Sequence, residues 1–495
     1  MNSDKQKYYT YSTIIALCYF FGFFTKDFYF MDDFYRSASG VFLWNQNGRP
    51  LTDFIFKLLS GDKIIDFYPL TLIVGIGSII IAADKLRNQL FDGQIWPGVI
   101  ATFLIIANPY LLANASFRYD SLTMFLPMAF VIWAVSIQSS KIISWQNVGV
   151  LLLLLLSWTT YQPAISLFIV LECIYFIHHR LLKRNQTYYI QFFSHILALI
   201  ISYLIYSFFV HHLIAGLYSL KHSQLLALNS HVFSGFMDNI FSFLYIIHLL
   251  FMGHFRYIFY YLFFVVYIGI IYIDLIHIRN KNNHISKLYS YIFLFSPVIL
   301  TLFSFLIFCI LKEPVLRYRV MLGFSGVLLY AFYILYKVFG RKISIYLTLP
   351  ILLILFIYSN SYTKAQENRY QLYMNVIASI GQTLSEHPSQ EKILYVAGDI
   401  PIQSINTSIT HAVPLIDQVI KRYFIQQYTQ ETPSGMYSSS LYVFKHSFLT
   451  HNYTIKFVKK SEILNANNFS VISQNEYYSL GQKGSAFAVV FSGED

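Results

Sequence analysis

Long apolar runs separated by short polar breaks dominate residues 1–360 of the chain. A hydrocarbon core about 30 Å thick is crossed by roughly 20 apolar residues in a helix, and many of these runs approach that length. The pattern therefore predicts a polytopic α-helical membrane protein with about eleven spans. The expected spans lie near residues 9–26, 66–83, 95–112, 122–138, 147–161, 164–179, 189–212, 257–276, 289–311, 320–338 and 343–360.

The apolar stretch at 240–253 does not fit this series, because it is shorter than a membrane span. Counting it as a span would also place the basic loop HIRNKNNHISK on the outer side, against the preference of Lys and Arg for cytoplasmic loops. We therefore predict that this segment re-enters the membrane or lies at its surface.

The composition changes at about Asn360 to polar residues with mixed charges. The remaining residues, 361–495, are numerous enough to form a core of their own. The segment 365–384 has a helical pattern, and EKILYVAGDIP is typical of a buried strand that ends in a Gly-Asp turn. We predict a membrane core at 1–360 followed by a soluble α/β domain at 361–495. An odd number of spans and a cytoplasmic N-terminus would place that domain outside.

Composition and charge agree with a membrane core. The chain is 56% hydrophobic and 12% charged, with a mean hydropathy of +0.51, which a soluble domain of this length would not show. The net charge of +11 follows from basic inner loops, so a nucleic-acid partner is not needed. Inside the predicted spans, the ionisable residues that stand out are Glu172, His195 and Asp274, which argues against an ion path through the membrane.

The first outer loop, residues 25–66, contains the strongest candidate chemistry of the chain, in KDFYFMDDFYRSASGVFLWNQNGRPL. One carboxylate of Asp32 and Asp33 could accept the proton of an attacking hydroxyl group, while the other orients it, binds a divalent ion or fixes an arginine. The alternative is a hydrated loop with helix-capping acids. The nearby Arg36 and Arg49, together with several aromatic residues, favour the first interpretation.

Two further outer loops carry cations. NPYLLANASFRYDSL contains Arg118 and Asp120, which could form a local ion pair, or Arg118 could neutralise a phosphate through bidentate hydrogen bonds. KEPVLRYRV contains Lys312, Arg317 and Arg319 where a phosphate-bearing lipid would present its head group. These side chains could instead extend to the phosphates of the bulk membrane lipid.

Other polar positions give weaker predictions. The YQPA turn at 161–164 is short enough to serve mainly as a hairpin, and the outer histidines have no metal-ligand spacing, so we expect interfacial positions for them (His211, His212, His222 and His231). The three cysteines imply neither a disulfide framework nor a zinc site. No cofactor is predicted, and the aspartate pair leaves dependence on a divalent metal open.

With these motifs, the chain resembles the Gtr-type serotype-specific glucosyltransferases, phage-borne enzymes that add glucosyl branches to the O-antigen of Gram-negative bacteria. The resemblance rests on DDFYR followed by G, W and NGRPL (32–51), the NPYLLANASFRYDSL loop (108–122), the YQPA turn, the basic loop near Arg317, and SYTKAQENRY.

The resemblance implies a GT-C-like architecture in the bacterial inner membrane, with a periplasmic C-terminal domain. It implies undecaprenyl phosphate-glucose as the donor and a sugar of the lipopolysaccharide O-antigen as the acceptor. In an inverting reaction, Asp32 or Asp33 would deprotonate the acceptor, and Arg118, Arg317 or Arg319 would stabilise the leaving phosphate.

Two other functions are compatible with many helices and a basic outer rim. One is a flippase for the same lipid-linked sugar, which the scarcity of charge inside the predicted spans disfavours. The other is an O-antigen polymerase, which the predicted soluble C-terminal domain and the position of the aspartate pair disfavour.

Overall fold

Each apolar run that predicts a span lies in a helix or in a short series of helices. This is seen in a computed structural model that describes residues 3–139, 141–142, 144–182, 188–215, 217–227, 229–278, 285–387, 391–401, 403–420, 439–447, 449–464 and 469–493. The helices of these runs are α1 (Ser3–Tyr19), α2 (Phe21–Thr25), α5 (Leu70–Leu90), α6 (Ile95–Ile106), α8 (Ser121–Ser136), α9 (Trp145–Thr160), α10 (Ala164–Phe176), α11 (Tyr188–Val210), α14 (Arg256–Ile273), α15 (Ile285–Leu294), α16 (Ser296–Phe303) and α17 (Phe324–Glu386).

Four segments are long and apolar enough to cross a membrane, among the described residues and by length and composition alone: 188–210, 232–251, 256–276 and 318–386. The helices at 95–106 and 109–115 give a fifth if they are counted as one span bent by 49°. Other apolar helices, such as α8 and α9, are shorter. The predicted spans therefore lie in helices, but their number, about eleven, stays a prediction, because four or five of the described segments qualify by length and composition.

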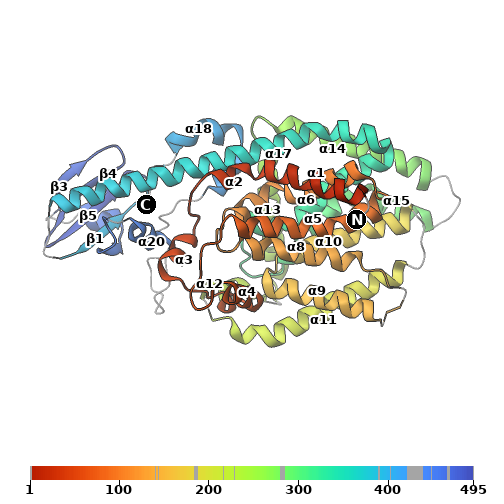
Figure 1. The fold of residues 1–495 in the computed structure, drawn as a ribbon, viewed down its shortest axis with the longest axis horizontal. Coiled ribbons are helices and arrows are strands. Elements are labelled where there is room, and N and C mark those ends of the chain that lie inside the picture. The colour runs from red at the N-terminus through yellow and green to blue at the C-terminus, as the bar shows by residue number, and fades with distance from the viewer. Residues whose placement is uncertain are drawn as a thin grey trace.

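The helices form an elongated bundle with a β-sheet at one end (Figure 1). Helices α3 (Asp33–Ser39), α4 (Pro50–Ser60) and α12 (Leu217–Ser223) lie toward the same end, which we call the sheet end. Close packing inside the bundle depends on small residues: a Cβ atom on Gly75 of α5 would lie only 2.9 Å from the Cβ of Phe125 on α8. Helices packed this closely leave no voids between them, and their many atomic contacts gain dispersion energy.

Helix α17 runs across the predicted boundary at residue 360. The predicted spans 320–338 and 343–360 and the predicted helical segment 365–384 belong largely to this one element, which changes direction at Gly340, where φ is +69°. The helix continues past residue 360 because its next turns also bury an apolar face, including Tyr373, Ile377 and Ile380. The change of composition marks a change of surroundings and not the end of the helix.

The C-terminal sheet contains β1 (Ile393–Ala397), β2 (Thr454–Phe457), β3 (Phe469–Gln474), β4 (Tyr478–Lys483) and β5 (Ala486–Phe491), in the order β2-β1-β5-β4-β3. Strand β1 is parallel to β2 and β5, whereas β4 is antiparallel to both of its neighbours. The accompanying helices are α18 (Gln403–Ala412), α19 (Pro414–Val419), α20 (Ser439–His446) and α21 (Lys460–Leu464). The predicted strand and its Gly-Asp turn are confirmed as β1 followed by Gly398, with φ of +76°.

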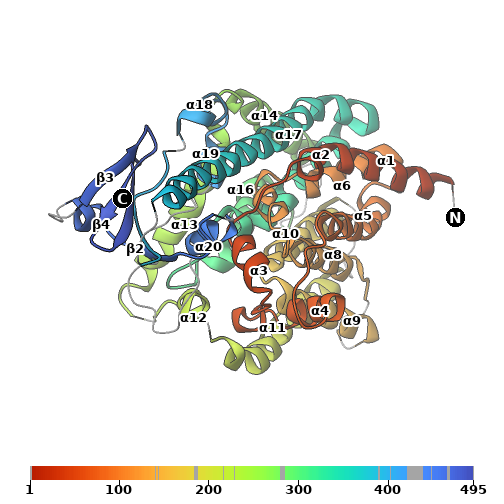
Figure 2. The ribbon, with the colours of Figure 1, turned by 60° about the vertical axis from the view of Figure 1, so that its left-hand side comes forward.

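The predicted first outer loop and the C-terminal domain pack together. Phe34 of α3 belongs to the same buried cluster as Tyr373 and strand residues such as Val396. The ring of His446 on α20 lies 5.7 Å from that of Phe34, and Figure 2 shows α20 beside α3. The acidic motif is therefore held between the bundle and the C-terminal domain.

Helix α13 (Val232–His248) and the 3-10 turn η5 (Leu249–Phe251) include most of the segment predicted to re-enter the membrane. The helix begins earlier than predicted, so shortness no longer argues against a span. The flanks of this segment contact other parts of the chain: the N–H of Leu226 donates to the carbonyl of Ile310 (2.9 Å), and that of His254 donates to the carbonyl of Ala412 (3.1 Å), the last residue of α18. A re-entrant or surface position for 240–253 stays a prediction.

Candidate functional site

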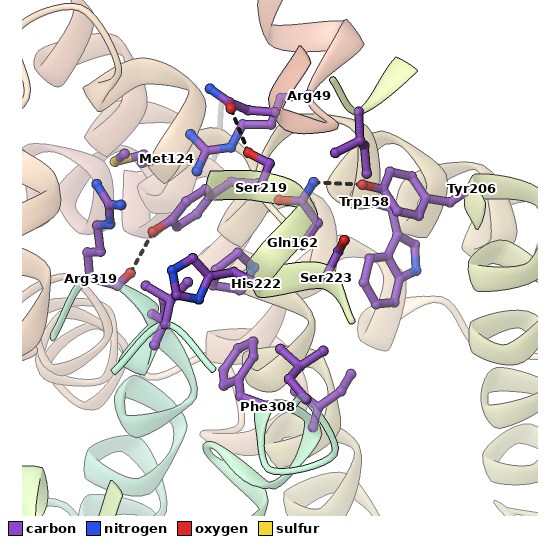
Figure 3. Close-up of a pocket in the computed structure, with 18 of the residues that line it drawn as sticks. Arg49, Met124, Trp158, Gln162, Tyr206, Ser219, His222, Ser223, Phe308 and Arg319 are labelled. Carbon is purple, nitrogen blue, oxygen red and sulfur yellow. Dashed lines mark hydrogen bonds between the residues drawn. The ribbon is translucent and has the colours of Figure 1, made fainter. Parts of the chain in front are cut away.

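A cavity of about 540 Å³ lies at the sheet end, between the predicted first outer loop, α11, α12 and the segment that precedes α17. Its polar lining includes Asp32, Arg36, Asn47, Arg49, Asp120, Gln162, His222 and Arg319. Its apolar lining includes Trp158, Leu199, Ile200, Ile307, Phe308, Ile310, Leu311 and Val315. Figure 3 shows Arg49 and Arg319 on one side, Trp158 and Tyr206 on the other, and the ring of His222 between them. The cavity thus combines a charged side with an apolar side.

Asp120 joins the first two predicted outer loops. Its carboxylate lies 3.3 Å from Nε of Arg36 and 3.7 Å from Nη1 of Arg49, and it accepts a hydrogen bond from Nε1 of Trp44. The guanidinium of Arg36 stacks 3.9 Å above the Trp44 ring and donates to the carbonyl of Phe42. The alternative of a local ion pair between Arg118 and Asp120 does not hold, because each residue has partners elsewhere in the chain.

Arg49 and Arg319 meet at Tyr161. The guanidinium of Arg49 lies 4.6 Å above the Tyr161 ring, and the Tyr161 hydroxyl donates to the backbone carbonyl of Arg319 (2.8 Å). Burial lowers the pKa of Arg49, and the positive charge of Arg319 adds to this effect. Arginine remains cationic at physiological pH despite such shifts, so an anion that enters the cavity would relieve the repulsion. The described lining holds three arginines and two carboxylates, which leaves one net positive charge.

The adjacent aspartates have different surroundings. Asp32 is exposed and lines the cavity, and within the described residues its carboxylate has no hydrogen-bond or ion-pair partner. Asp33 is 0% exposed and accepts hydrogen bonds from the backbone N–H groups of Phe30 (2.9 Å) and Arg118 (3.1 Å). Burial raises the pKa of Asp33 well above its ordinary range, although these hydrogen bonds oppose the shift. Asp33 thus fastens the two loops together, and Asp32 faces the space where a ligand would bind.

Three predicted phosphate-binding residues lie outside the cavity lining. Arg118 donates to Asp66 (2.7 Å) and pairs with Asp27, so two carboxylates already neutralise it. Lys312 and Arg317 are exposed to solvent. Arg317 has an extended backbone, whereas Arg319 is in the 3-10 turn η8 (Tyr318–Gly323), so the chain turns between these two arginines.

The cavity also contains residues for which the sequence predicted only a minor role. Gln162, in the YQPA turn, donates from Nε2 to the carbonyl of Gly48 (2.8 Å) and to the hydroxyl of Tyr206 (2.9 Å), and so ties this turn to the first loop. His222 lines the cavity from α12, beside Ser219 and Ser223. The spacing of these three residues places them on one helical face. This pattern is visible in the sequence, although it is not a metal-ligand spacing.

The ionisable residues within predicted spans are paired internally. His195 Nδ1 lies 2.5 Å from the Glu172 carboxylate, and Asp274 accepts a hydrogen bond from the Ser290 hydroxyl. Both pairs lie outside the cavity lining. Among the residues that the structure describes, no group of three or more His, Cys, Asp or Glu side chains is placed to hold a metal ion.

Substitution of Asp120 by Ala is expected to lower the free energy of unfolding by about 3–5 kcal/mol, because it leaves two buried arginines and the Trp44 N–H without their carboxylate. Thermal unfolding of the detergent-solubilised protein would measure the loss. Asp238→Ala is the matched control, since this side chain is exposed and has no partner within the described part of the chain. Equal stability of the two variants would contradict a structural role for the Asp120 network.

The polar lining of the cavity lies within a match to a known protein family. A family model described as "Glucosyl transferase GtrII" matches residues 21–330, a range that includes every polar lining residue named above. The chain is also 29% identical over 434 residues to an uncharacterized 55.3 kDa protein in the gtrB 5′ region of Salmonella phage P22, covering 85% of this chain and 88% of the phage protein.

Proposed function

The chain belongs to the GtrII family of glucosyl transferases, and on that premise we propose that it moves glucose from undecaprenyl phosphate-glucose to a sugar of the lipopolysaccharide O-antigen. The reaction would take place at the periplasmic face of the bacterial inner membrane and would convert the serotype. The position of the phage relative in the gtrB 5′ region supports this setting. The observation that carries the proposal is the cavity that joins an arginine-lined side to an apolar side.

The charged side of the cavity suits the phosphate of such a donor. A phosphodiester carries one negative charge, which matches the one net positive charge of the described ionisable lining. Arg36, Arg49 and Arg319 can each direct planar N–H groups toward phosphate oxygens. Asp120 holds two of these arginines in place before the donor arrives. Such an arrangement is organised in advance for an anion.

The apolar side suits an isoprenoid chain. A volume of about 540 Å³ is within the usual range for small-molecule sites, but it is too small for a complete undecaprenyl chain. Ile200 and Ile310, which line the cavity, remain 52% and 47% exposed, so the apolar side opens to the protein surface beside α11. Helix α11 is long and apolar enough to cross a membrane. The first isoprene units would lie in the cavity, and the rest of the chain would extend into lipid.

The proposed reaction is a single displacement at C1 of glucose. Asp32 accepts the proton of the acceptor hydroxyl, and that oxygen forms the new bond to C1. The bond between C1 and the phosphate oxygen breaks with its electron pair, and undecaprenyl phosphate leaves from the opposite face of the sugar. The arginines stabilise the charge that develops on the phosphate. The configuration at C1 is inverted.

The direct test uses purified protein in detergent with undecaprenyl phosphate-glucose and O-antigen from a susceptible host. Mass spectrometry should show one added hexose per modified unit, and linkage NMR should show an anomeric configuration opposite to that of the donor. Retained configuration would contradict the single displacement. Donor translocation in liposomes without any sugar transfer would favour a flippase, and longer O-antigen chains would favour a polymerase.

Substitution of Leu199 by Gln is expected to raise KM for undecaprenyl phosphate-glucose by about 5- to 100-fold, because an amide without partners would replace apolar surface in the lipid-binding side. KM for a donor with a much shorter isoprenoid should change less. Leu197→Gln is the control, since Leu197 is on the same helix but is exposed and outside the cavity lining. An equal effect on both donors would contradict chain binding at Leu199.

A further inference from the structure

The side-chain amide of Gln162 is fixed in one orientation by hydrogen bonds to the cavity wall. Its Nε2 donates to the carbonyl of Gly48 (2.8 Å) and to the hydroxyl of Tyr206 (2.9 Å), and this hydroxyl donates to the same carbonyl (3.0 Å). A carbonyl oxygen can only accept a hydrogen bond, so the nitrogen end of the amide must face Gly48. Both amide hydrogens are then in use, and the oxygen end, Oε1, faces the other way.

The oxygen end of this amide is presented to the cavity. Gln162 belongs to the cavity lining, and within the described part of the chain no N–H or O–H group bonds to its Oε1. Figure 3 shows the amide nitrogen directed at the Tyr206 hydroxyl and the oxygen on the side away from it. An acceptor that is held in place inside a cavity is suited to a hydroxyl or N–H group of a ligand.

Gly48 makes this arrangement possible and places it beside an arginine. Its φ is +72°, and a Cβ atom at this position would lie 2.6 Å from the Tyr206 hydroxyl oxygen, so the close approach requires glycine. Gly48 precedes Arg49, and Gln162 follows Tyr161, whose ring lies 4.6 Å from the Arg49 guanidinium. Both ends of the connection therefore adjoin the contact of Arg49 with Tyr161, and Oε1 lies next to one of the cavity arginines.

An aromatic wall adjoins the amide on its other side. The ring of Trp158, which lines the cavity, stacks on that of Tyr206 at 5.5 Å and 23°, and its N–H donates to the hydroxyl of Ser202 (3.2 Å). A hexose has hydroxyl groups around its rim and C–H groups on its faces. An amide oxygen beside fixed aromatic rings can meet both kinds of surface, because the rings offer apolar area and the oxygen accepts a hydrogen bond.

We propose that Gln162 is a specificity residue for the transferred hexose and that its Oε1 accepts a hydrogen bond from one hydroxyl of that sugar. The inference rests on the proposed function, because it takes the sugar of the lipid-linked donor as the ligand. The hexose is bonded directly to the phosphate, so a phosphate at Arg49 would bring the sugar beside the amide that is fastened to the preceding residue. A site that bonds a hydroxyl discriminates against a donor that lacks it.

The test compares undecaprenyl phosphate-glucose with its 2-, 3-, 4- and 6-deoxy analogues. For the wild type, kcat/KM should fall by about 10- to 100-fold for the analogue that leaves Oε1 unpaired. Gln162→Met keeps the length of the side chain but has no amide oxygen. In this variant kcat/KM for the glucose donor should fall toward that of the same deoxy analogue, so that the ratio between the two approaches one. Gln162→Ala should show the same ratio and decides the matter if the Met variant does not fold.

Two controls separate the amide oxygen from the stability of the wall. Tyr206→Phe removes one partner of the Gln162 nitrogen but leaves Oε1 in place, because the Gly48 carbonyl still holds the amide. It should unfold at a lower temperature than the wild type and yet keep the wild-type ratio. Gln46→Met makes the same substitution on an exposed side chain of the first loop outside the cavity lining, and it should also keep the ratio.

The outcomes distinguish the inference from the function on which it rests. Wild-type ratios for every analogue in a folded Gln162 variant would overturn the inference and leave Gln162 as a tether between the YQPA turn and the first loop. Equal loss of discrimination in Tyr206→Phe and Gln162→Met would also overturn it, since the wall and not Oε1 would then select the sugar. Absence of hexose transfer by the wild type would instead refute the proposed function itself.

Discussion

Replacement of Asp32 by Asn is expected to lower the rate of hexose transfer by about 10²- to 10⁴-fold, the usual contribution of a general base. The carboxylate lines the cavity, and among the described residues it has no partner that would occupy it. For the same reason the variant should be as stable as the wild type. Single-turnover transfer monitored by mass spectrometry, together with thermal unfolding in detergent, would measure both properties.

Asp33→Asn is the matched control at the adjacent position, and we expect its main effect on stability. The Asn side chain has only one acceptor oxygen for the backbone N–H groups of Phe30 and Arg118, so the free energy of unfolding should fall by about 1–3 kcal/mol. The folded fraction should keep most of its turnover. Loss of turnover in folded Asp33→Asn, with full turnover in Asp32→Asn, would show that the assignment of the base is wrong.

The pH dependence of stability provides a second distinction between these aspartates. Burial raises the pKa of Asp33, so the folded state binds the proton more tightly than the unfolded state does. The stabilisation from this proton is fully present below the ordinary carboxyl pKa and is lost as the pH rises through the folded-state pKa. Asn cannot titrate. The Asp33→Asn variant should therefore lack the part of the wild-type decline in stability that this carboxyl causes.

The sequence predicted the helical segments well because length and apolar content determine where a helix is favourable in lipid or in a helical core. The strand at 393–397 was also predictable, because its apolar run ends at a Gly-Asp turn. The continuation of α17 beyond residue 360 was not predictable from the sequence. A change from apolar to mixed residues shows that the surroundings change, but it contains no helix-stop signal, and the next turns still bury one face.

Five predicted site residues line the cavity, from three separate loops: Asp32, Arg36 and Arg49, then Asp120, then Arg319. The first loop placed Asp32, Arg36 and Arg49 within one short segment, and all three line the cavity. The partners of Asp120 and Arg118 depend on how distant loops pack, which local spacing does not specify. Each of these residues had a plausible neighbour in the sequence, and each instead bonds to residues of the first loop.

The contact between α3 and the C-terminal domain suggests why the two occur in one chain. Helix α3 begins immediately after Asp32, and it buries Phe34 in the core of the domain. Tyr35 of α3 also lies 5.0 Å, ring to ring, from Tyr442 of α20. A carboxylate at the start of a short helix gains a defined position when the rest of the helix is packed on two sides. The domain would therefore support the geometry of the proposed base in addition to any contact with the acceptor.

Replacement of Arg319 by Gln is expected to lower kcat/KM for undecaprenyl phosphate-glucose by about 10²- to 10³-fold, because it removes a cation aimed at the charge that develops on the leaving phosphate. The fold should persist, since Tyr161 and Asn114 bond to the backbone carbonyl of this residue. Steady-state kinetics at low and high salt would measure the effect, and the loss should persist in high salt because a half-buried charge is poorly screened.

Arg317→Gln provides the matched control, since it removes the same charge two residues away, on an exposed side chain outside the cavity lining. We expect kcat/KM to change by less than about threefold in this variant, and we expect high salt to abolish the change. The reason is that an exposed charge contributes only a long-range attraction to an anionic donor. A larger loss of kcat/KM in Arg317→Gln than in Arg319→Gln would show that the phosphate binds at the outer rim of the loop. The arginines of the cavity would then serve the structure of the first loop and not the departure of the phosphate.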